Sequence, residues 1–256
     1  MSTRLFTSLL PKIAPSVPGA PQPLVIQYIR DVAIRACETS LAWRYVEAPF
    51  AIQPGSYVNY FNKPENTDVH VLFRVTCNGQ ILRRATLEDA IDMYPEWAEQ
   101  FNGLTANEIW AQTPTTTVNE DEYNDVQFNG NITVTLPAAA SENGGEPRVV
   151  TQISPDQYVV LPMPGTDKVY TMRMFYALKP SRTATGMDDT VMNELEDVIV
   201  HGALQQLLVM PKVVWNDNTL ASYHARQYLA RVNERRARSN LNNSRSGLTA
   251  RGNGFA

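Results

Sequence analysis

The sequence predicts an α+β protein: a three-helix bundle built from both ends of the chain, a long inserted β-rich lobe, and an extended arm at each terminus. Two observations predict this class. Apolar residues recur every three or four positions near both ends of the chain and every second position in its middle. The 256 residues, 43% of them apolar, are enough for one large domain or two small ones with a folded core.

The start of the chain changes character after residue 23. Residues 1–23 contain five prolines and no apolar period, which predicts an extended, proline-rich N-terminal arm. From Leu24 to about Tyr45 the apolar residues follow helical spacing, so residues 24–48 are expected to supply the first part of the helical bundle domain. Trp43 is expected to lie near the end of this helix.

Residues 49–180 form the predicted inserted β-rich domain. Alternating apolar positions predict a strand over 69–77, and the Asn-Gly pair at 78–79 predicts a tight turn into the next strand. Residues 86–89 have the spacing of a capping box, which predicts a short helix. Further strands are predicted over 132–136, 158–161 and 168–178.

Helical spacing returns over 181–239, which completes the predicted bundle domain. One helix is expected to begin at Asp188, whose carboxylate suits a helix N-terminus, and to end before Pro211. A last helix is expected from Thr219 to about Ser239. The residues expected to pack the helices together, two of them small enough for close approach, are Trp43, Gly202, Ala203, Leu207 and Trp215.

Charge is distributed unevenly along the chain. Residues 221–256 hold seven arginines and one acid, for +6, and the net charge of −4 leaves −10 for the other residues. A basic end on an acidic body indicates contact with nucleic acid or with an acidic protein surface; a solvated basic helix with a loose end is the alternative. Because the planar guanidinium suits fixed pairing, the exclusive use of arginine there favours a specific contact. Residues 240–256 are expected to be a flexible basic C-terminal arm.

The sequence offers no catalytic, cofactor-binding or metal-binding constellation. His70, His201 and His224 have no carboxylate or second histidine at ligand spacing, which predicts structural roles. Cys37 and Cys77 lie in different contexts and form neither a disulfide framework nor a metal knuckle. We therefore expect no enzyme, no cofactor and no metal. No apolar stretch approaches the ~20 residues needed to cross a bilayer, so no membrane partner is expected.

Two parts of the sequence resemble the head-tail connector proteins of tailed bacteriophages, also called adaptor or head-completion proteins. The residues that carry the resemblance are Ile34–Ser40, Trp43-Arg44, His201–Leu208, Pro211, Trp215, Asn216, Ala221 and Tyr223. The resemblance covers residues 24–46 and 165–240, and it implies a helical bundle that carries an inserted β region.

The resemblance implies a structural virion protein that forms a ring, commonly of twelve subunits. Such a ring docks under the portal, connects the DNA-filled head to the tail and passes the genome through its lumen. The implied partners are the portal protein, further copies of the chain, a downstream tail or neck protein and the double-stranded DNA in the lumen. The implied location is the head-tail neck of the virion, and before assembly the host cytoplasm. The residues expected to dock on the portal are Arg231, Arg235, Arg238, Leu241, Arg245, Leu248, Arg251 and Phe255.

Two alternatives stay open at this point. One alternative is another neck or tail-completion ring protein of the same virion, because the sequence separates neighbouring rings poorly. The chain is also compatible with a nucleic-acid-binding module whose C-terminal arginine helix lies along phosphates, which predicts strongly salt-dependent binding to free DNA.

Overall fold

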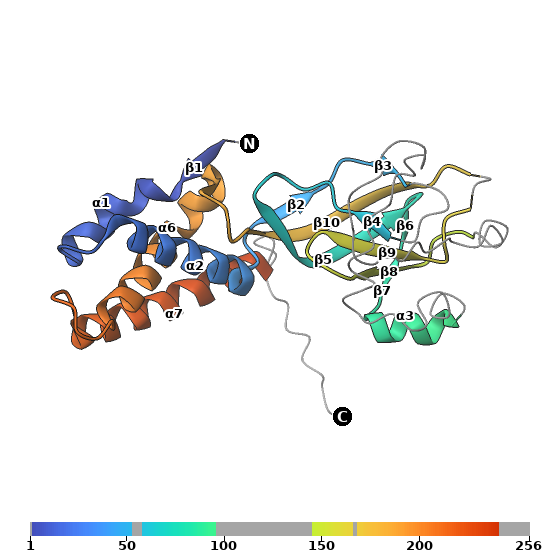
Figure 1. Ribbon diagram of the computed structural model, residues 1–256. Coiled ribbons are helices and arrows are strands. Elements are labelled where there is room, and N and C mark those ends of the chain that lie inside the picture. The colour runs from blue at the N-terminus through green and yellow to red at the C-terminus, as the bar shows by residue number, and fades with distance from the viewer. Residues whose placement is uncertain (1, 53–57, 96–144, 166–167, 241–256) are drawn as a thin grey trace, which may run out of the picture. The chain divides into compact units, whose positions relative to one another are not determined.

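A computed structural model describes residues 2–52, 58–95, 145–165 and 168–240 (Figure 1). Its helices and strands confirm the predicted α+β class. In chain order, with η for a 3-10 helix, the elements are β1 (Thr3–Leu5), η1 (Phe6–Leu9), α1 (Leu10–Ile13), η2 (Ala14–Ser16), α2 (Gln22–Ser40), β2 (Arg44–Val46), β3 (Phe50–Ala51), β4 (Val58–Tyr60), β5 (Thr67–Cys77), β6 (Gln80–Ile81), β7 (Arg83–Arg84), α3 (Leu87–Met93), β8 (Val149–Gln152), β9 (Gln157–Leu161), β10 (Thr171–Pro180), β11 (Gly186–Asp188), α6 (Asp189–Leu208) and α7 (Asn218–Asn240).

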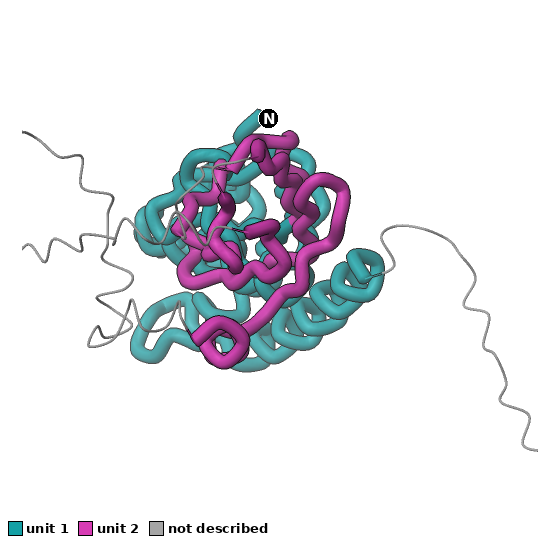
Figure 2. Tube along the Cα trace, turned by 90° about the vertical axis from the view of Figure 1, so that its right-hand side faces the viewer, with its two compact units in different colours: residues 1–45, 63–71, 176–256 teal, residues 46–62, 72–175 magenta. Residues whose placement is uncertain are grey.

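The chain divides into two compact units, which Figure 2 shows in different colours. Unit 1 comprises residues 1–45, 63–71 and 176–256, and unit 2 comprises residues 46–62 and 72–175. Strands β2, β5 and β10 each contribute residues to both units.

Unit 1 is built on three long helices, α2, α6 and α7, each of which contacts the other two. Their inward positions follow the predicted spacing, because Ile29 and Val32 of α2, Ile199 of α6 and Val232 of α7 are all buried. Helix α6 begins as predicted: the Asp188 carboxylate accepts hydrogen bonds from the backbone N–H groups of the next turn.

Helix α2 ends earlier than predicted. Its last helical residue is Ser40, and Leu41 takes the left-handed conformation with φ of 52°. The Leu41 N–H still donates to the Cys37 carbonyl at 2.9 Å, which closes the final turn. Trp43 therefore follows the helix, and Tyr45 lies in β2. The expected helix end was wrong because no glycine or asparagine marks the left-handed position in the sequence.

The expected extended arm over residues 1–23 is not what the structure shows. Strand β1 pairs antiparallel with β11, and the segment after it, which contains three short helical turns, buries four apolar side chains. These side chains are Phe6, Leu9, Ile13 and Val17. Three of the prolines occupy the first turns of α1, η2 and α2, where a missing backbone N–H leaves no hydrogen bond unmade.

Gly186 makes the pairing of β1 with β11 possible. A Cβ at this position would overlap the backbone carbonyl oxygen of Arg4. Only glycine therefore lets the first strand approach β11 closely enough to form the ladder.

Unit 2 contains residues of two sheets. One has the strand order β4-β9-β8-β7, with β8 antiparallel to β9 and parallel to β7. The other has the order β2-β10-β5-β6, and β3 pairs with β10 at its side. The predicted turn at 78–79 is present, with φ of 48° and 83°, and sets the β5–β6 register with Thr76 opposite Ile81.

The layers of unit 2 follow from the burial of β8 and β9, which face protein on both sides. Helix α3 covers one side, where Ala90 packs on Val149, Val159 and Leu161. On the other side, the Tyr158 ring lies 4.8 Å from that of Phe61. Burial and the nearby Glu47 carboxylate raise the pKa of Tyr158, and the Glu47 N–H donates to Met174 of β10. The order of layers is therefore α3, the β4-β9-β8-β7 sheet, and the β2-β10-β5-β6 sheet.

The predicted capping box of α3 is confirmed. The Thr86 Oγ1 accepts from the Asp89 N–H at 3.1 Å, and the Asp89 carboxylate accepts from the Thr86 N–H at 3.4 Å. The predicted strands over 158–161 and 168–178 correspond to β9 and β10. The predicted strand over 132–136 lies outside the described residues.

Candidate functional site

Helix α7 carries the described part of the predicted portal-docking set. It begins after Asp217, whose carboxylate accepts from the N–H groups of Thr219 and Leu220 at 2.9 Å each. Ala221 and Val232 are buried and pack the helix into unit 1. Four arginines of this helix are exposed at the surface of the unit, namely Arg226, Arg231, Arg236 and Arg238.

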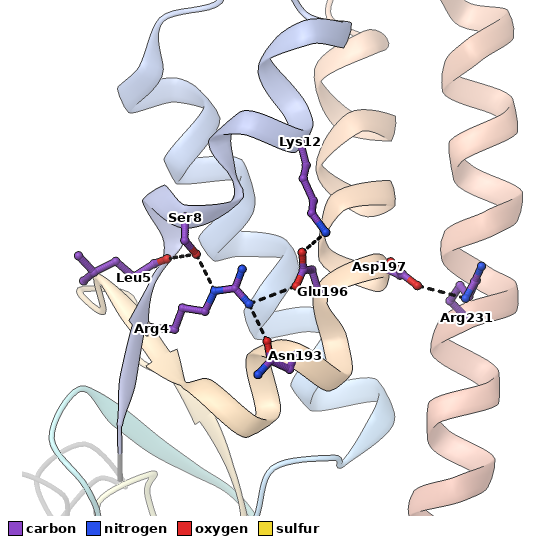
Figure 3. Close-up of polar contacts among 8 residues, drawn as sticks. All are labelled: Arg4, Leu5, Ser8, Lys12, Asn193, Glu196, Asp197 and Arg231. Carbon is purple, nitrogen blue, oxygen red and sulfur yellow. Dashed lines mark hydrogen bonds and ion pairs between the residues drawn. The ribbon is translucent and has the colours of Figure 1, made fainter.

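Two of the predicted docking arginines have acidic partners within the chain. Arg231 reaches Asp197 of α6 at 3.2 Å, as Figure 3 shows, and Arg238 reaches Glu234 one turn earlier in α7 at 2.6 Å. All four side chains are about half exposed. Such pairs are screened by water and contribute little to stability, so a stronger partner can replace them.

The third predicted docking arginine, Arg235, differs from these two. It is half-buried because it follows Val232 by three positions and so lies toward the packed side of α7. None of Arg235, Arg226 and Arg236 forms an ion pair with a described residue. These three guanidinium groups are therefore the cations of α7 that lack an acid within the described ranges. The remaining predicted docking residues, which lie outside the described residues, are Leu241, Arg245, Leu248, Arg251 and Phe255.

Gly202, predicted to pack helices together, lies where α2 and α7 meet α6. A Cβ at this position would lie 2.5 Å from Val32 Cγ1 of α2 and 2.9 Å from Tyr228 Cδ2 of α7. Real Cβ atoms almost never come so close, so any larger side chain must displace both neighbours.

The other predicted packing residues lie at different depths. Ala203 and Leu207 of α6 are fully buried, and Trp43 is 5% exposed. The Trp43 carbonyl accepts from the Leu178 N–H at 2.8 Å, which fixes the chain after α2 to β10. Trp215 is half-buried in the connection between α6 and α7.

The N-terminal segment is clamped to α6 by charges that sequence reasoning missed. Figure 3 shows Arg4 and Lys12 converging on Glu196, which lies on α6. The Arg4 guanidinium is 3.1 Å from the Glu196 carboxylate and donates to Asn193 at 2.7 Å. The hydrogen bond from Lys12, with a further one from Arg4, lowers the pKa of Glu196 despite its burial. The sequence predicts an extended arm over residues 1–23, and no local pattern links this segment to position 196.

His201 and His224, for which the sequence predicted structural roles, lie next to each other in the structure. The Nδ1 atoms of the two imidazoles, one on α6 and one on α7, are 2.8 Å apart, so one ring donates a hydrogen bond to the other. Burial lowers the pKa of both histidines, and each positive charge would oppose the other. The pair was missed because its members are 23 residues apart on two helices, where ligand spacing within one helix gives no signal.

The described residues hold no group of three metal-ligating side chains. Burial raises the pKa of the thiols of Cys37 and Cys77, which favours their protonated form. No helix among the described ranges is both long and apolar enough to cross a membrane.

The comparisons with known proteins place the chain in a family. The model of the SU10 adaptor protein family matches residues 5–251, which is nearly the whole chain. No curated protein matches it. The match supports the resemblance to head-tail connector proteins that the motifs of α2, α6 and α7 carry. The chain belongs to the SU10 adaptor protein family, a family of structural proteins of bacteriophage virions.

Proposed function

We propose that the chain forms a ring of twelve copies that docks under the portal, connects the DNA-filled head to the tail and passes the genome through its lumen. Membership of the adaptor family supports a place among the virion proteins between portal and tail. The observation that carries the docking proposal is the charge of α7, where Arg226, Arg235 and Arg236 lack an acid among the described residues.

The chemistry of these arginines selects the kind of partner. A guanidinium can form two parallel hydrogen bonds with one carboxylate, so an acidic groove on the portal would hold α7 in a fixed orientation. The sequence after α7 adds Arg245 and Arg251, with Leu241, Leu248 and Phe255 spaced between them. We propose that these apolar side chains fill clefts of the portal while the arginines pair with its carboxylates.

Removal of residues 241–256 tests this docking. The shortened chain retains every described element, so it is expected to fold with unchanged circular dichroism but to lose attachment to portal-bearing, DNA-filled heads. Co-sedimentation with such heads measures the attachment. A chain in which residues 241–256 are replaced by sixteen Gly and Ser residues is the matched control and should fail as well. Undiminished attachment of either variant would contradict the docking proposal.

A second test separates docking on a protein from binding to nucleic acid. The docking proposal assigns Arg226, Arg235 and Arg236 to carboxylates of the portal and not to phosphates. The proposal therefore predicts weak binding to free double-stranded DNA and tight binding to an assembled portal ring. Tight, steeply salt-dependent DNA binding without portal binding would favour the nucleic-acid module instead.

The remaining alternative, another neck or tail-completion ring protein, is tested by whether the chain attaches directly to the portal. An adaptor attaches directly to the portal, whereas another neck or tail-completion ring attaches only after an adaptor is present. Mixing the purified chain with isolated portal rings distinguishes the two, because direct attachment is expected only for the adaptor.

A further inference from the structure

We propose that neighbouring copies of the chain contact each other through two different surfaces of unit 2. The arginine face of one copy packs against the acidic face of the next. The arginine face is the outer surface of the β2-β10-β5-β6 sheet formed by Val46, Arg74, Thr76, Ile81, Thr171, Arg173 and Phe175. The acidic face is the outer surface of α3 formed by Glu88, Ile91 and Asp92. This inference rests on the proposed ring and names the contact that would build it.

The arginine face is exposed and combines charge with apolar area. Met172 and Met174 of β10 are fully buried, so the alternate residues Thr171 and Arg173 point outward. Arg173 lies over the Phe175 ring, 5.4 Å from its centroid.

The neighbouring strands extend this face. The Thr76 hydroxyl of β5 lies 3.5 Å from the Arg173 carbonyl of β10, and Thr76 is opposite Ile81 of β6. Arg74, two positions before Thr76, is exposed on the same side of β5. Ile81 is 63% exposed and Val46 is 47% exposed. An exposed sheet face with such residues is typical of an interaction surface.

The arginines of this face have no acidic partner in the part of the chain that the structure describes. Neither Arg74 nor Arg173 forms an ion pair with a described residue, and the seven residues of the face include no acid. The face therefore carries, on its central strands β10 and β5, two positive charges that no described acid compensates, and the exposed side chains of Val46 and Ile81 lie on the outer strands β2 and β6. Such a face suits a partner that combines acids with apolar area.

Helix α3 combines exposed acids with exposed apolar area. Glu88 and Asp92 are four positions apart on its exposed side, and Ile91, 37% exposed, lies beside them. Asp89 is held by the capping box and Ala90 faces the core, so neither belongs to this face. Glu88 and Asp92 form no ion pair with a described residue.

The layers of unit 2 exclude a contact between the two faces of one copy. Helix α3 lies outside one sheet and the arginine face lies outside the other, so the whole thickness of the unit separates them. They can meet only between copies. A contact that joins two different faces is heterologous, and its repetition closes into a ring when the rotation between copies allows it.

Charge reversal tests the contact in the full-length chain. Arg173→Glu is expected to reduce ring formation on portal rings at least tenfold, because it places a carboxylate against Glu88 and Asp92 of the neighbour. Asp92→Arg is expected to do the same from the other side. In the chain with both substitutions, position 173 again faces an opposite charge at position 92, so assembly is expected to recover in part. Mass photometry and negative-stain imaging count the copies on each portal ring.

The matched control is Arg148→Glu, which makes the same charge change at another exposed arginine of unit 2 and is expected to leave assembly unchanged. Equal loss in Arg173→Glu and Arg148→Glu, normal assembly of Arg173→Glu, or no recovery in the double variant would overturn the proposed contact. Should Arg173→Glu fail to fold by circular dichroism, Arg74→Glu with Glu88→Arg tests the same faces. Failure of the unmodified chain to form any ring on the portal would instead overturn the proposed function.

Discussion

The two units use their charged side chains differently. Within unit 1, six ion pairs join described residues, among them Arg4 and Lys12 with Glu196 and Lys179 with Glu38. In unit 2, Arg74 and Arg173 are exposed and form no ion pair with a described residue. Unit 2 is held together by apolar layers, as the burial of β8 and β9 shows.

This difference indicates where each unit meets its partners. The ion pairs of Arg4 and Lys12 with Glu196 hold the N-terminal segment to α6. Charges that are unpaired on unit 2, and on part of α7, add little to the stability of the chain and are available to a neighbour. If this is correct, substitutions of paired charges in unit 1 lower stability, whereas substitutions of unpaired charges on unit 2 leave stability unchanged and weaken contact with a neighbour.

The largest expected effect is that of Gly202→Leu in unit 1. The leucine must displace Val32 and Tyr228, so the free energy of unfolding is expected to fall by about 3 kcal/mol. Urea unfolding followed by circular dichroism measures the change. Ala230→Leu, on an exposed position of α7, is the control and should stay within about 0.5 kcal/mol. Unchanged stability of Gly202→Leu would mean that the three helices do not meet at this position.

The next effect concerns the clamp on the N-terminal segment. Glu196→Ala removes the acceptor of both Arg4 and Lys12 and is expected to cost about 1–2 kcal/mol. Limited proteolysis should also cleave the N-terminal segment faster. Glu194→Ala, an exposed acid on the same helix, is expected to change neither quantity. A stable, protease-resistant Glu196→Ala chain would show that the apolar side chains alone hold the segment.

The histidine pair predicts a smaller, pH-dependent effect. Burial lowers the pKa of His201 and His224 below 6.5, while Asp197 acts to raise that of His201 and Arg231 to lower it. The unfolded chain therefore binds protons first as the pH falls, and stability is expected to decrease below pH 6.5. Glu196, whose pKa is lowered from 4.5, keeps its contribution down to more acidic pH, so the window from pH 7.5 to 5 reports mainly on the histidines.

His224→Gln tests this assignment. The variant keeps one polar partner for His201 but removes one of the two titrating rings, so its melting temperature should fall less between pH 7.5 and 5 than that of the unmodified chain. An equal fall in both chains would assign the acid sensitivity to other groups.

The smallest expected effect is that of Arg173→Gln in unit 2. Because Arg173 has no acid partner among the described residues, its loss should change the free energy of unfolding by less than about 0.5 kcal/mol. Arg4→Gln, which removes a paired arginine of unit 1, is expected to cost about 1 kcal/mol. A larger loss for Arg173→Gln than for Arg4→Gln would reverse the contrast between the units.

Much of the fold was predictable because it depends on local patterns. Alternation over 69–77, the Asn-Gly turn at 78–79 and the capping box at 86–89 each specify one local conformation, and all three are present. The N-terminal segment was not predictable in this way. Its prolines suggested an extended chain, whereas packing of Phe6 and Leu9 on the unit overrides that tendency.

The candidate site was predictable only in part. The count of arginines near the C-terminus was evident from the sequence, but which of them have acids depends on contacts such as Arg231 with Asp197, 34 positions apart. The pairing of His201 with His224 likewise arises only when α6 and α7 pack together. Long-range contacts of this kind leave no mark on local spacing.

Cryo-electron microscopy of the chain assembled on its portal tests the central claim most directly. The account predicts a closed ring in which Arg226, Arg235 and Arg236 face carboxylates of the portal, and Arg74 and Arg173 of each copy face Glu88 and Asp92 of the next. A ring in which those arginines of unit 2 point into solvent, while ion pairs of unit 1 such as Arg4 with Glu196 are opened to bind neighbours, would contradict it.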